Sequence, residues 1–254
     1  MIDTHLHSSF STDSKMNIEE AMETAKEKGI GLTITDHMDL NYFDKSKFRF
    51  SVDEYMNKYS PLRSESFFIG IELGMGNDVL KENKYMVESY DFDQVIGSVH
   101  MLGNDDIYMS STYENKSKKD IFTKYLLTMI ECVKSHHFVD ILAHIDYMCR
   151  YCPYEDKEIY YEEFKDLIDQ VLKEIIKNNI VMEINTRRLE NKNAFNNLTK
   201  IYKRYENLGG KYVTIGSDAH LKDDIGKNFR QGKEIAKMCN LKPVYFKNRE
   251  MEYI

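Results

Sequence analysis

Short apolar runs alternate with longer amphipathic segments along the whole chain. The apolar runs predict strands at residues 2–7, 31–35, 67–71, 94–99, 138–143, 180–185 and 212–216, with a short last strand at 244–246. Apolar residues at helical spacing predict helices near residues 17–29, 51–59, 78–90, 117–137, 155–178, 194–208 and 229–238. These seven strand–helix units predict an α/β protein folded as a parallel barrel.

Several predicted helices begin at a residue that can cap them. Asn17 with Glu20 forms a capping-box pattern, and Gly29 can end the same helix in a left-handed conformation. Ser51 and Ser117 stand at the same position in two further helices, each with an acidic residue three positions later. No charge run, low-complexity tract or Pro/Gly/Ser-rich linker interrupts the units, so we expect one barrel domain over residues 1–254.

Composition narrows the class of protein and its partners. Hydrophobic residues make up 42% and aromatic residues 12% of the chain, which excludes a disordered protein, and the 30% of charged residues suit a soluble surface. A net charge of -7 provides no basic field for nucleic acid, so a polynucleotide substrate is disfavoured. No apolar run approaches the ~18 residues of a membrane span, and the first residues lead directly into a strand. We expect a cytoplasmic protein that acts on a small substrate; its oligomeric state is not predicted.

The four cysteines are too sparse for a disulfide framework. Cys149 and Cys152 form a C-x-x-C pair, but no second pair completes a zinc site and the surroundings do not resemble a redox motif. We therefore predict free thiols.

Histidines and acidic residues recur where predicted strands end. His5 and His7 lie two apart on one strand and so share a face. Six of the eight histidines stand at or just past the carboxyl end of a strand; the other two, His136 and His137, end a helix and are left out of the site. The end-of-strand residues are His5, His7, His37, Glu72, His100, His144, Asp218 and His220. In a parallel barrel these ends form one rim, where active sites are assembled.

Such a rim would bind metal ions. Imidazole and carboxylate ligands suit zinc, iron or manganese, and a carboxylate can bridge two ions. The number of candidate ligands exceeds what one tetrahedral ion uses, so we expect two or three divalent ions. Metals of this kind bring the pKa of a bound water toward neutrality and neutralise phosphoryl oxygens during in-line attack. The predicted chemistry is hydrolysis of a phosphate ester.

The ordered motifs resemble one known family. They are His5-Leu6-His7, Thr35-Asp36-His37, Gly70-Ile71-Glu72, Gly97-Ser98-Val99-His100, Ala143-His144-Ile145-Asp146 and Gly216-Ser217-Asp218-Ala219-His220. Together they resemble the polymerase-and-histidinol-phosphatase (PHP) family, from the first strand to the last helix. The G-S-V-H-x-L-G segment at 97–103, and G-S-D-A-H followed by Ile225-Gly226, are most similar to its histidinol-phosphatase branch. The resemblance implies a distorted (βα)7 TIM-like barrel that hydrolyses L-histidinol phosphate in histidine biosynthesis.

The resemblance also implies a trinuclear centre. Its first metal would be bound by His5, His7, Glu72 and Asp218, its second by the bridging Glu72 with His100 and His144, and its third by Asp13, His37 and His220. Some relatives carry histidine at the position of Asp13, so the third ion is expected to bind more weakly or to be a harder metal. Asp3, Asp36 and Asp146 are expected to orient ligands or cap loops rather than to bind metal.

Phosphate recognition favours a guanidinium, whose planar fork matches phosphate oxygens. The resemblance places a phosphate-contacting residue at Arg150, and Arg187 and Arg188 follow the sixth strand. Relatives often carry an arginine slightly later, where this chain has Glu190, so the second phosphate contact is left open between Arg187 and Arg188.

The catalytic residues expected from this site are Arg150, Asp218 and His220. Arg150 and the third ion would hold the phosphoryl oxygens. A metal-bound water or a nearby acid would protonate the leaving group, and either Asp218 or His220 could pass that proton. Two other functions stay open. One is a PHP-family phosphoesterase acting on another small phosphomonoester or on nucleotides or oligonucleotides. The other is a non-catalytic binding barrel, which would be expected to lack some of the ligands.

Overall fold

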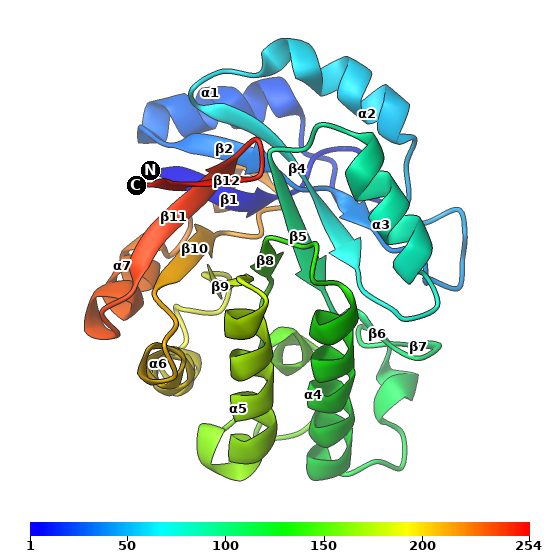
Figure 1. The fold of residues 1–254 in the computed structure, drawn as a ribbon, viewed down its shortest axis with the longest axis vertical. Helices are drawn as coiled ribbons and strands as arrows, with labels where there is room; N and C mark the ends of the chain where they lie inside the picture. Colours follow the sequence, from blue (N-terminus) through cyan, green and yellow to red (C-terminus); the bar gives the residue numbers. More distant parts are fainter.

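Seven parallel strands form a barrel with helices on its outside (Figure 1), in a computed structural model that describes residues 1–254. Around the barrel the strands are β1 (Ile2–Leu6), β2 (Gly31–Ile34), β4 (Phe67–Gly74), β5 (Gln94–Ser98), β8 (Ile141–Leu142), β9 (Val181–Asn185) and β10 (Tyr212–Gly216). The ring closes just beyond β1 and β10, where the His7 N–H donates to the Ala219 carbonyl at 2.8 Å. At the amino end β10 pairs instead with β11 (Lys242–Lys247), so the barrel is distorted, as predicted.

Three of the seven helices begin where the capping residues predict. The helices are α1 (Ile18–Lys28), α2 (Val52–Tyr59), α3 (Leu80–Ser89), α4 (Lys118–Ser135), α5 (Tyr161–Lys177), α6 (Lys192–Asn207) and α7 (Phe229–Met238). The side chain of Asn17 accepts the N–H groups of Glu19 and Glu20, which caps α1. Gly29 ends α1 with a φ of 65°, a conformation that glycine adopts without steric cost. Ser51 and Ser117 cap α2 and α4 in the same way.

The short elements lie mainly in the connections. They are β3 (His37–Met38), β6 (Met101–Leu102), β7 (Asp105–Asp106) and the 3-10 helices η1 (Ser60–Leu62), η2 (Ser110–Tyr113), η3 (Tyr147–Arg150) and η4 (Lys222–Asp224). No helix has the length and apolar character that crossing a membrane requires. The four cysteines are free, as predicted, and all four are buried.

Three predicted boundaries are wrong. The strand β4 continues through Glu72 to Gly74, because β3 extends its ladder on one side and β5 on the other. The strand β8 is only two residues long, shorter than the predicted 138–143. The helix α5 begins at Tyr161 rather than near 155, and the preceding segment is a loop in which Glu158 contacts Arg188.

A C-terminal hairpin closes the amino end of the barrel. The strand β12 (Glu250–Tyr253), which was not predicted, pairs with β11 through a turn at Asn248 and Arg249. Arg249 donates to the carboxylate of Asp140 and its N–H to the carbonyl of Asp93, at the starts of two barrel strands. Val244 and Phe246 of β11 join a small apolar cluster with residues of β5, β8 and β9. The carboxyl end is left as the open end of the barrel.

Candidate active site

One carboxylate, that of Glu72, stands at the centre of the predicted cluster. Glu72 is fully buried in β4, and both of its oxygens face imidazole nitrogens. Its Oε2 lies 3.4 Å from Nε2 of His5, 3.7 Å from Nε2 of His7 and 2.7 Å from Nδ1 of His37, and its Oε1 lies 3.4 Å from Nε2 of His100 and 3.0 Å from Nε2 of His144. The fold therefore gathers five predicted ligands, from the ends of β1, β5 and β8 and from β3, around a sixth.

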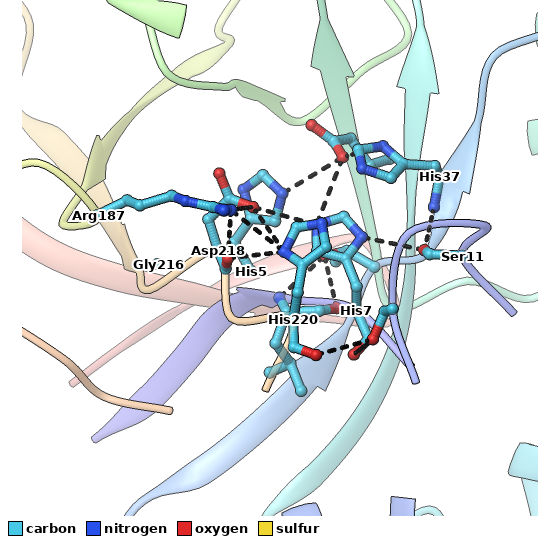
Figure 2. A network of polar contacts seen from close by, with 12 residues as sticks. His5, His7, Ser11, His37, Arg187, Gly216, Asp218 and His220 are labelled. Carbon is cyan, nitrogen blue, oxygen red and sulfur yellow. Dashed lines mark hydrogen bonds and ion pairs between the residues drawn. The ribbon is translucent and has the colours of Figure 1, made fainter. Parts of the chain in front are cut away.

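The remaining three predicted ligands complete the same cluster. Asp218 Oδ1 lies 3.3 Å from Nε2 of His7, and Asp13 Oδ2 lies 3.2 Å from Nε2 of His220 and 3.7 Å from Nε2 of His37. The ring of His7 stacks on those of His37 and His220, with centroids 4.2 and 4.1 Å apart (Figure 2). All nine predicted ligand residues thus lie at the carboxyl rim of the barrel.

Hydrogen bonds behind the cluster orient three of the imidazoles. Nδ1 of His5 lies 2.7 Å from Oε1 of Glu183, and Nδ1 of His100 lies 3.0 Å from Oδ1 of Asp39. Nδ1 of His7 lies 3.1 Å from Oγ of Ser11. A histidine that binds metal through one ring nitrogen usually donates the other N–H to such a group. The same three rings therefore present Nε2 toward the centre of the cluster.

These Nε2 atoms are buried and make no hydrogen bond. Oε2 of Glu72 likewise makes no hydrogen bond, because its 2.7 Å contact with Nδ1 of His37 lacks hydrogen-bond geometry. Leaving a buried polar atom unpaired costs about 1–3 kcal/mol, so a cluster of them at one point calls for a ligand. The donor set, imidazole nitrogen with carboxylate oxygen, fits divalent transition metals. Groups of three such ligand atoms lie within 4.8 Å of one another at several places in the cluster.

Electrostatics in the cluster depend on the same contacts. Burial opposes the charged form of Glu72, but the charges of His37, His5 and His100 hold its pKa well below the usual value. Burial likewise opposes the charge of Asp218, and Arg150 outweighs it, so the pKa of Asp218 is also low. Burial lowers the pKa of His7, with a further contribution from His220. The low pKa values favour anionic Glu72 and Asp218 and neutral His7, which are the forms that bind metal. Burial opposes the charge of His5 and His100, but the neighbouring carboxylates outweigh it and raise their pKa, so a metal ion would displace a proton from these two rings.

Asp218 has an unusual backbone. Its φ is 55°, in the left-handed region that few residues other than glycine adopt. The Asp218 N–H donates to the His5 carbonyl at 2.7 Å, which fixes this conformation at the point where the barrel closes. Strained residues of this kind often occur at functional sites.

Asp3, Asp36 and Asp146, which were expected to orient ligands or cap loops, contact residues around the ligand cluster rather than its centre. Asp36 accepts the N–H and hydroxyl groups of Ser8 and Ser11, which holds the loop after β1. Asp3 accepts the N–H and hydroxyl of Ser217 and the N–H of Gly226. Asp146 pairs with Arg188 at 2.7 Å. Asp3 and Asp36 therefore fix the two loops that carry His7 and Asp218.

The three candidate arginines are placed differently. Nη1 of Arg150 donates to Oδ2 of Asp218 at 2.6 Å, and Nη1 of Arg187 lies 3.1 Å from the Asp218 carbonyl and 3.2 Å from Nδ1 of His220. Both guanidinium groups border the cluster. Arg188 instead pairs with Asp146 and Glu158, so its position does not support the phosphate contact predicted for it.

Sequence reasoning missed the residues that orient the ligands. Glu183 lies in the middle of an apolar strand, two residues before Asn185 and on the same face. A charged residue within a buried run is the signal that could have identified it. Asp39 follows His37 by two positions, and Ser98 precedes His100 by two; the Ser98 hydroxyl donates to Oε1 of Glu72.

A pocket of about 590 Å³ opens onto the cluster. Asp13, His37, His100 and His220 belong to both, and Arg187, which borders the cluster, also lines the pocket. Its other walls are largely aromatic: Tyr42, Phe43 and Phe48 from the loop after β3, Tyr108 from the segment after β7, and Tyr147 and Tyr151 from the region of η3. This pocket can hold a small organic group next to the predicted metal site.

A distorted barrel whose carboxyl rim gathers imidazole and carboxylate ligands around an open pocket is the architecture of a metal-binding hydrolase. Comparison with known proteins agrees. The PHP domain family matches residues 3–187, and the chain belongs to this family.

Full-length relatives point to one branch of the family. A "Probable histidinol-phosphatase" of Clostridium acetobutylicum is 50% identical over 253 residues, covering 100% of this chain and 99% of the relative. A histidinol-phosphatase of Lactococcus lactis is 30% identical over 230 residues, covering 87% and 84%. The crystal structure of a histidinol phosphate phosphatase from Lactococcus lactis, complexed with zinc, L-histidinol and phosphate, matches with a TM-score of 0.94 and 26% identity over 99% of this chain and 98% of that one.

Proposed function

We propose that this protein hydrolyses L-histidinol phosphate to L-histidinol and phosphate, with two or three divalent metal ions in the Glu72 cluster. The observation that carries the proposal is the set of buried imidazole Nε2 atoms that surround Glu72 and make no hydrogen bond. Their presence argues against a non-catalytic barrel. The activity named for the full-length relatives supplies the substrate.

The metal assignment follows the two oxygens of Glu72. His5, His7, Glu72 and Asp218 would hold one ion, and Glu72, His100 and His144 a second. Oε2 of Glu72 faces the first group and Oε1 faces the second, as a bridging carboxylate requires. Asp13, His37 and His220 would hold a third ion. Asp13 is the most exposed of these ligands, with 43% of its side chain accessible, in keeping with a weaker third ion.

The metals, when bound, activate a water as nucleophile and neutralise charge on the phosphoryl group. Arg150 and Arg187 stand beside the cluster, where their N–H groups can hold phosphoryl oxygens. Asp218 orients both arginines through its carboxylate and its carbonyl. We assign transfer of the leaving-group proton to the Asp218–His220 pair, in which Oδ1 and Nδ1 lie 3.6 Å apart.

The pocket supports a small substrate with an organic cation. Guanidinium groups and the predicted metals lie at one end, where a phosphate would bind. Aromatic walls and the carboxylates of Asp39 and Asp106 line the rest, which suits an imidazole ring and an ammonium group. The net charge of -7 disfavours a nucleic acid substrate.

Phosphate release by the metal-loaded protein tests the proposal. L-histidinol phosphate is compared with p-nitrophenyl phosphate, a sugar phosphate, a nucleotide and a short DNA. We expect kcat/KM for L-histidinol phosphate to exceed that for the others by about a hundredfold or more, a difference of about 2.7 kcal/mol in transition-state binding. Preference for the nucleotide or DNA would reject the proposal in favour of the other PHP-family activity.

Two histidine variants serve as a matched pair in the same assay. His37→Ala removes a cluster residue and is expected to lower turnover without unfolding the barrel. His137→Ala removes an exposed histidine next to the C-terminal end of α4 and is expected to behave as wild type. Normal activity and full metal content in His37→Ala would contradict the role assigned to His37.

A further inference from the structure

Asp106 is a buried carboxylate with no cationic side chain within salt-bridge distance, and the main charge acting on it is that of His100. It lies in β7, only 8% exposed, and no lysine, arginine or histidine nitrogen lies within 4 Å of it. Its one close backbone contact is the N–H of Tyr108, which donates to Oδ1 at 2.8 Å. The Tyr42 hydroxyl interacts with the same carboxylate. A buried carboxylate is usually paired with a cation or fully hydrogen-bonded, so Asp106 is an exception.

Other buried aspartates of the chain follow the rule. Asp146 is paired with Arg188, Asp93 with Arg63 and Asp39 with His100. Asp36 has no cation, but four N–H and hydroxyl groups donate to it. The environment of Asp106 is therefore not a general property of acidic residues in this fold.

Asp106 lines the pocket that opens onto the metal cluster. It is not among the groups of side chains placed to share a metal ion. The lysine and the arginine of the pocket are engaged elsewhere, since Arg187 contacts Asp218 and Lys47 lies 3.8 Å from Asp44. Its histidines also have other partners: His37 faces Glu72, His100 faces Asp39 and His220 faces Asp13. The cation that Asp106 lacks can therefore come from a molecule in the pocket.

We propose that Asp106 binds the cationic nitrogen of the substrate's organic group and thereby determines specificity. The inference rests on the proposed function and adds the residue that selects a cationic phosphomonoester over a neutral one. A charge-assisted hydrogen bond in a partly dry pocket is stronger than one between neutral groups. The aromatic walls, with Phe43 and Tyr108 at 61% and 64% exposure, offer faces against which an organic cation can pack.

Three substrates separate the contributions to binding. L-histidinol phosphate carries both an ammonium group and an imidazole. 3-(Imidazol-4-yl)propyl phosphate lacks the ammonium group, and propyl phosphate lacks both. Each is assayed with the metal-loaded wild type, with Asp106→Asn and with Asp105→Asn. Asp105 is the matched control, because it is the neighbouring aspartate in β7 but its side chain is exposed and forms surface pairs with Lys116 and Lys124.

In Asp106→Asn we expect kcat/KM for L-histidinol phosphate to fall about 10- to 100-fold, mainly through KM. The loss for propyl phosphate should be at least tenfold smaller. If kcat/KM for 3-(imidazol-4-yl)propyl phosphate does not change, Asp106 contacts the ammonium group. If it falls as much as kcat/KM for L-histidinol phosphate, Asp106 contacts the imidazole ring. Either result supports the proposal. In Asp105→Asn we expect kcat/KM for all three substrates to stay at the wild-type value.

If kcat/KM in Asp106→Asn falls equally for all three substrates, or does not fall for any of them, the role assigned to Asp106 is wrong. Asp106→Glu, which retains the charge, should recover part of the preference, and thermal melting verifies that each variant is folded. Product inhibition gives an independent measurement: Ki for L-histidinol should rise in Asp106→Asn while Ki for inorganic phosphate does not. A wild type that does not prefer L-histidinol phosphate over propyl phosphate would instead reject the proposed function itself.

Discussion

Nδ1 of His5 lies 2.7 Å from Oε1 of Glu183, a residue 178 positions further along the chain. The other oxygen of Glu183 accepts the backbone N–H of His144 at 2.8 Å. One carboxylate therefore fixes the ring of one predicted ligand and the backbone of another. Gly216 makes this possible, because a Cβ at that position would lie 2.6 Å from Oε1 of Glu183 and 2.4 Å from Cβ of His5.

Glu183→Gln is expected to weaken metal binding by about 10- to 100-fold. The amide can still contact His5, but it no longer provides the negative charge that makes the imidazole a stronger ligand. Activity should fall at limiting metal and recover in excess metal, as measured by metal titration with phosphate release. Glu190→Gln, which changes an exposed carboxylate in the next loop, is the control. Unchanged metal affinity in Glu183→Gln would contradict this role.

Glu72→Gln should have the larger effect. Both oxygens of Glu72 face imidazoles, so the substitution alters two predicted metal positions at once. We expect activity to fall by about a thousandfold or more, equivalent to about 4 kcal/mol, and bound metal measured by elemental analysis to fall by about half or more. Glu82→Gln on the surface of α3 is the control. A variant that keeps its metals and most of its activity would exclude a bridging role for Glu72.

The metal ligands could be predicted because two local rules apply to them. Residues two apart on a strand share a face, which paired His5 with His7. Residues that follow parallel strands lie at one rim of the barrel. This rule predicted that His100, His144 and Asp218 belong to the site, and it required no knowledge of the strand order. Glu72 fits the same rim although its strand continues for two more residues.

The supporting residues could not be predicted in this way, because their partners depend on the assembled barrel. Glu183 contacts His5 across the barrel, from a strand that is not adjacent to β1 in the sheet. Arg187 and Arg188 differ by one position in the same turn, yet one borders the cluster and the other is paired with Asp146 and Glu158. Such tertiary contacts determine where a side chain in a turn points. The pattern of hydrophobic and polar residues in the sequence does not predict this direction.

Arg150→Gln should therefore mainly affect catalysis, and Arg188→Gln should mainly affect stability. Arg150 borders the cluster, so its loss is expected to raise KM and lower kcat, together by about a hundredfold in kcat/KM. Loss of Arg188 leaves two carboxylates without their cation and is expected to lower the free energy of unfolding by about 3 kcal/mol. Urea denaturation and steady-state kinetics on both variants separate the effects. A larger loss of kcat/KM in Arg188→Gln than in Arg150→Gln would reverse the assignment.

The stability of the metal-free protein should depend on pH through His37. Burial alone would lower the pKa of this imidazole, but the charge of Glu72 outweighs it and raises the pKa to about 9. An unfolded histidine titrates near 6.5. The raised pKa therefore stabilises the fold fully below about pH 6.5, and this contribution is lost as the pH rises toward 9.

Metal binding reverses this dependence, because a divalent ion must displace the proton from His37. We expect the melting temperature of chelator-treated protein to fall between pH 6.5 and 9, and the increase produced by added zinc or manganese to be larger at pH 9 than at pH 6.5. In His37→Gln both trends should be reduced, whereas His137→Gln, which changes a histidine outside the cluster, should retain them. A metal-induced increase that is the same at both pH values would show that no proton is displaced, and that the His37–Glu72 pair does not take part in binding.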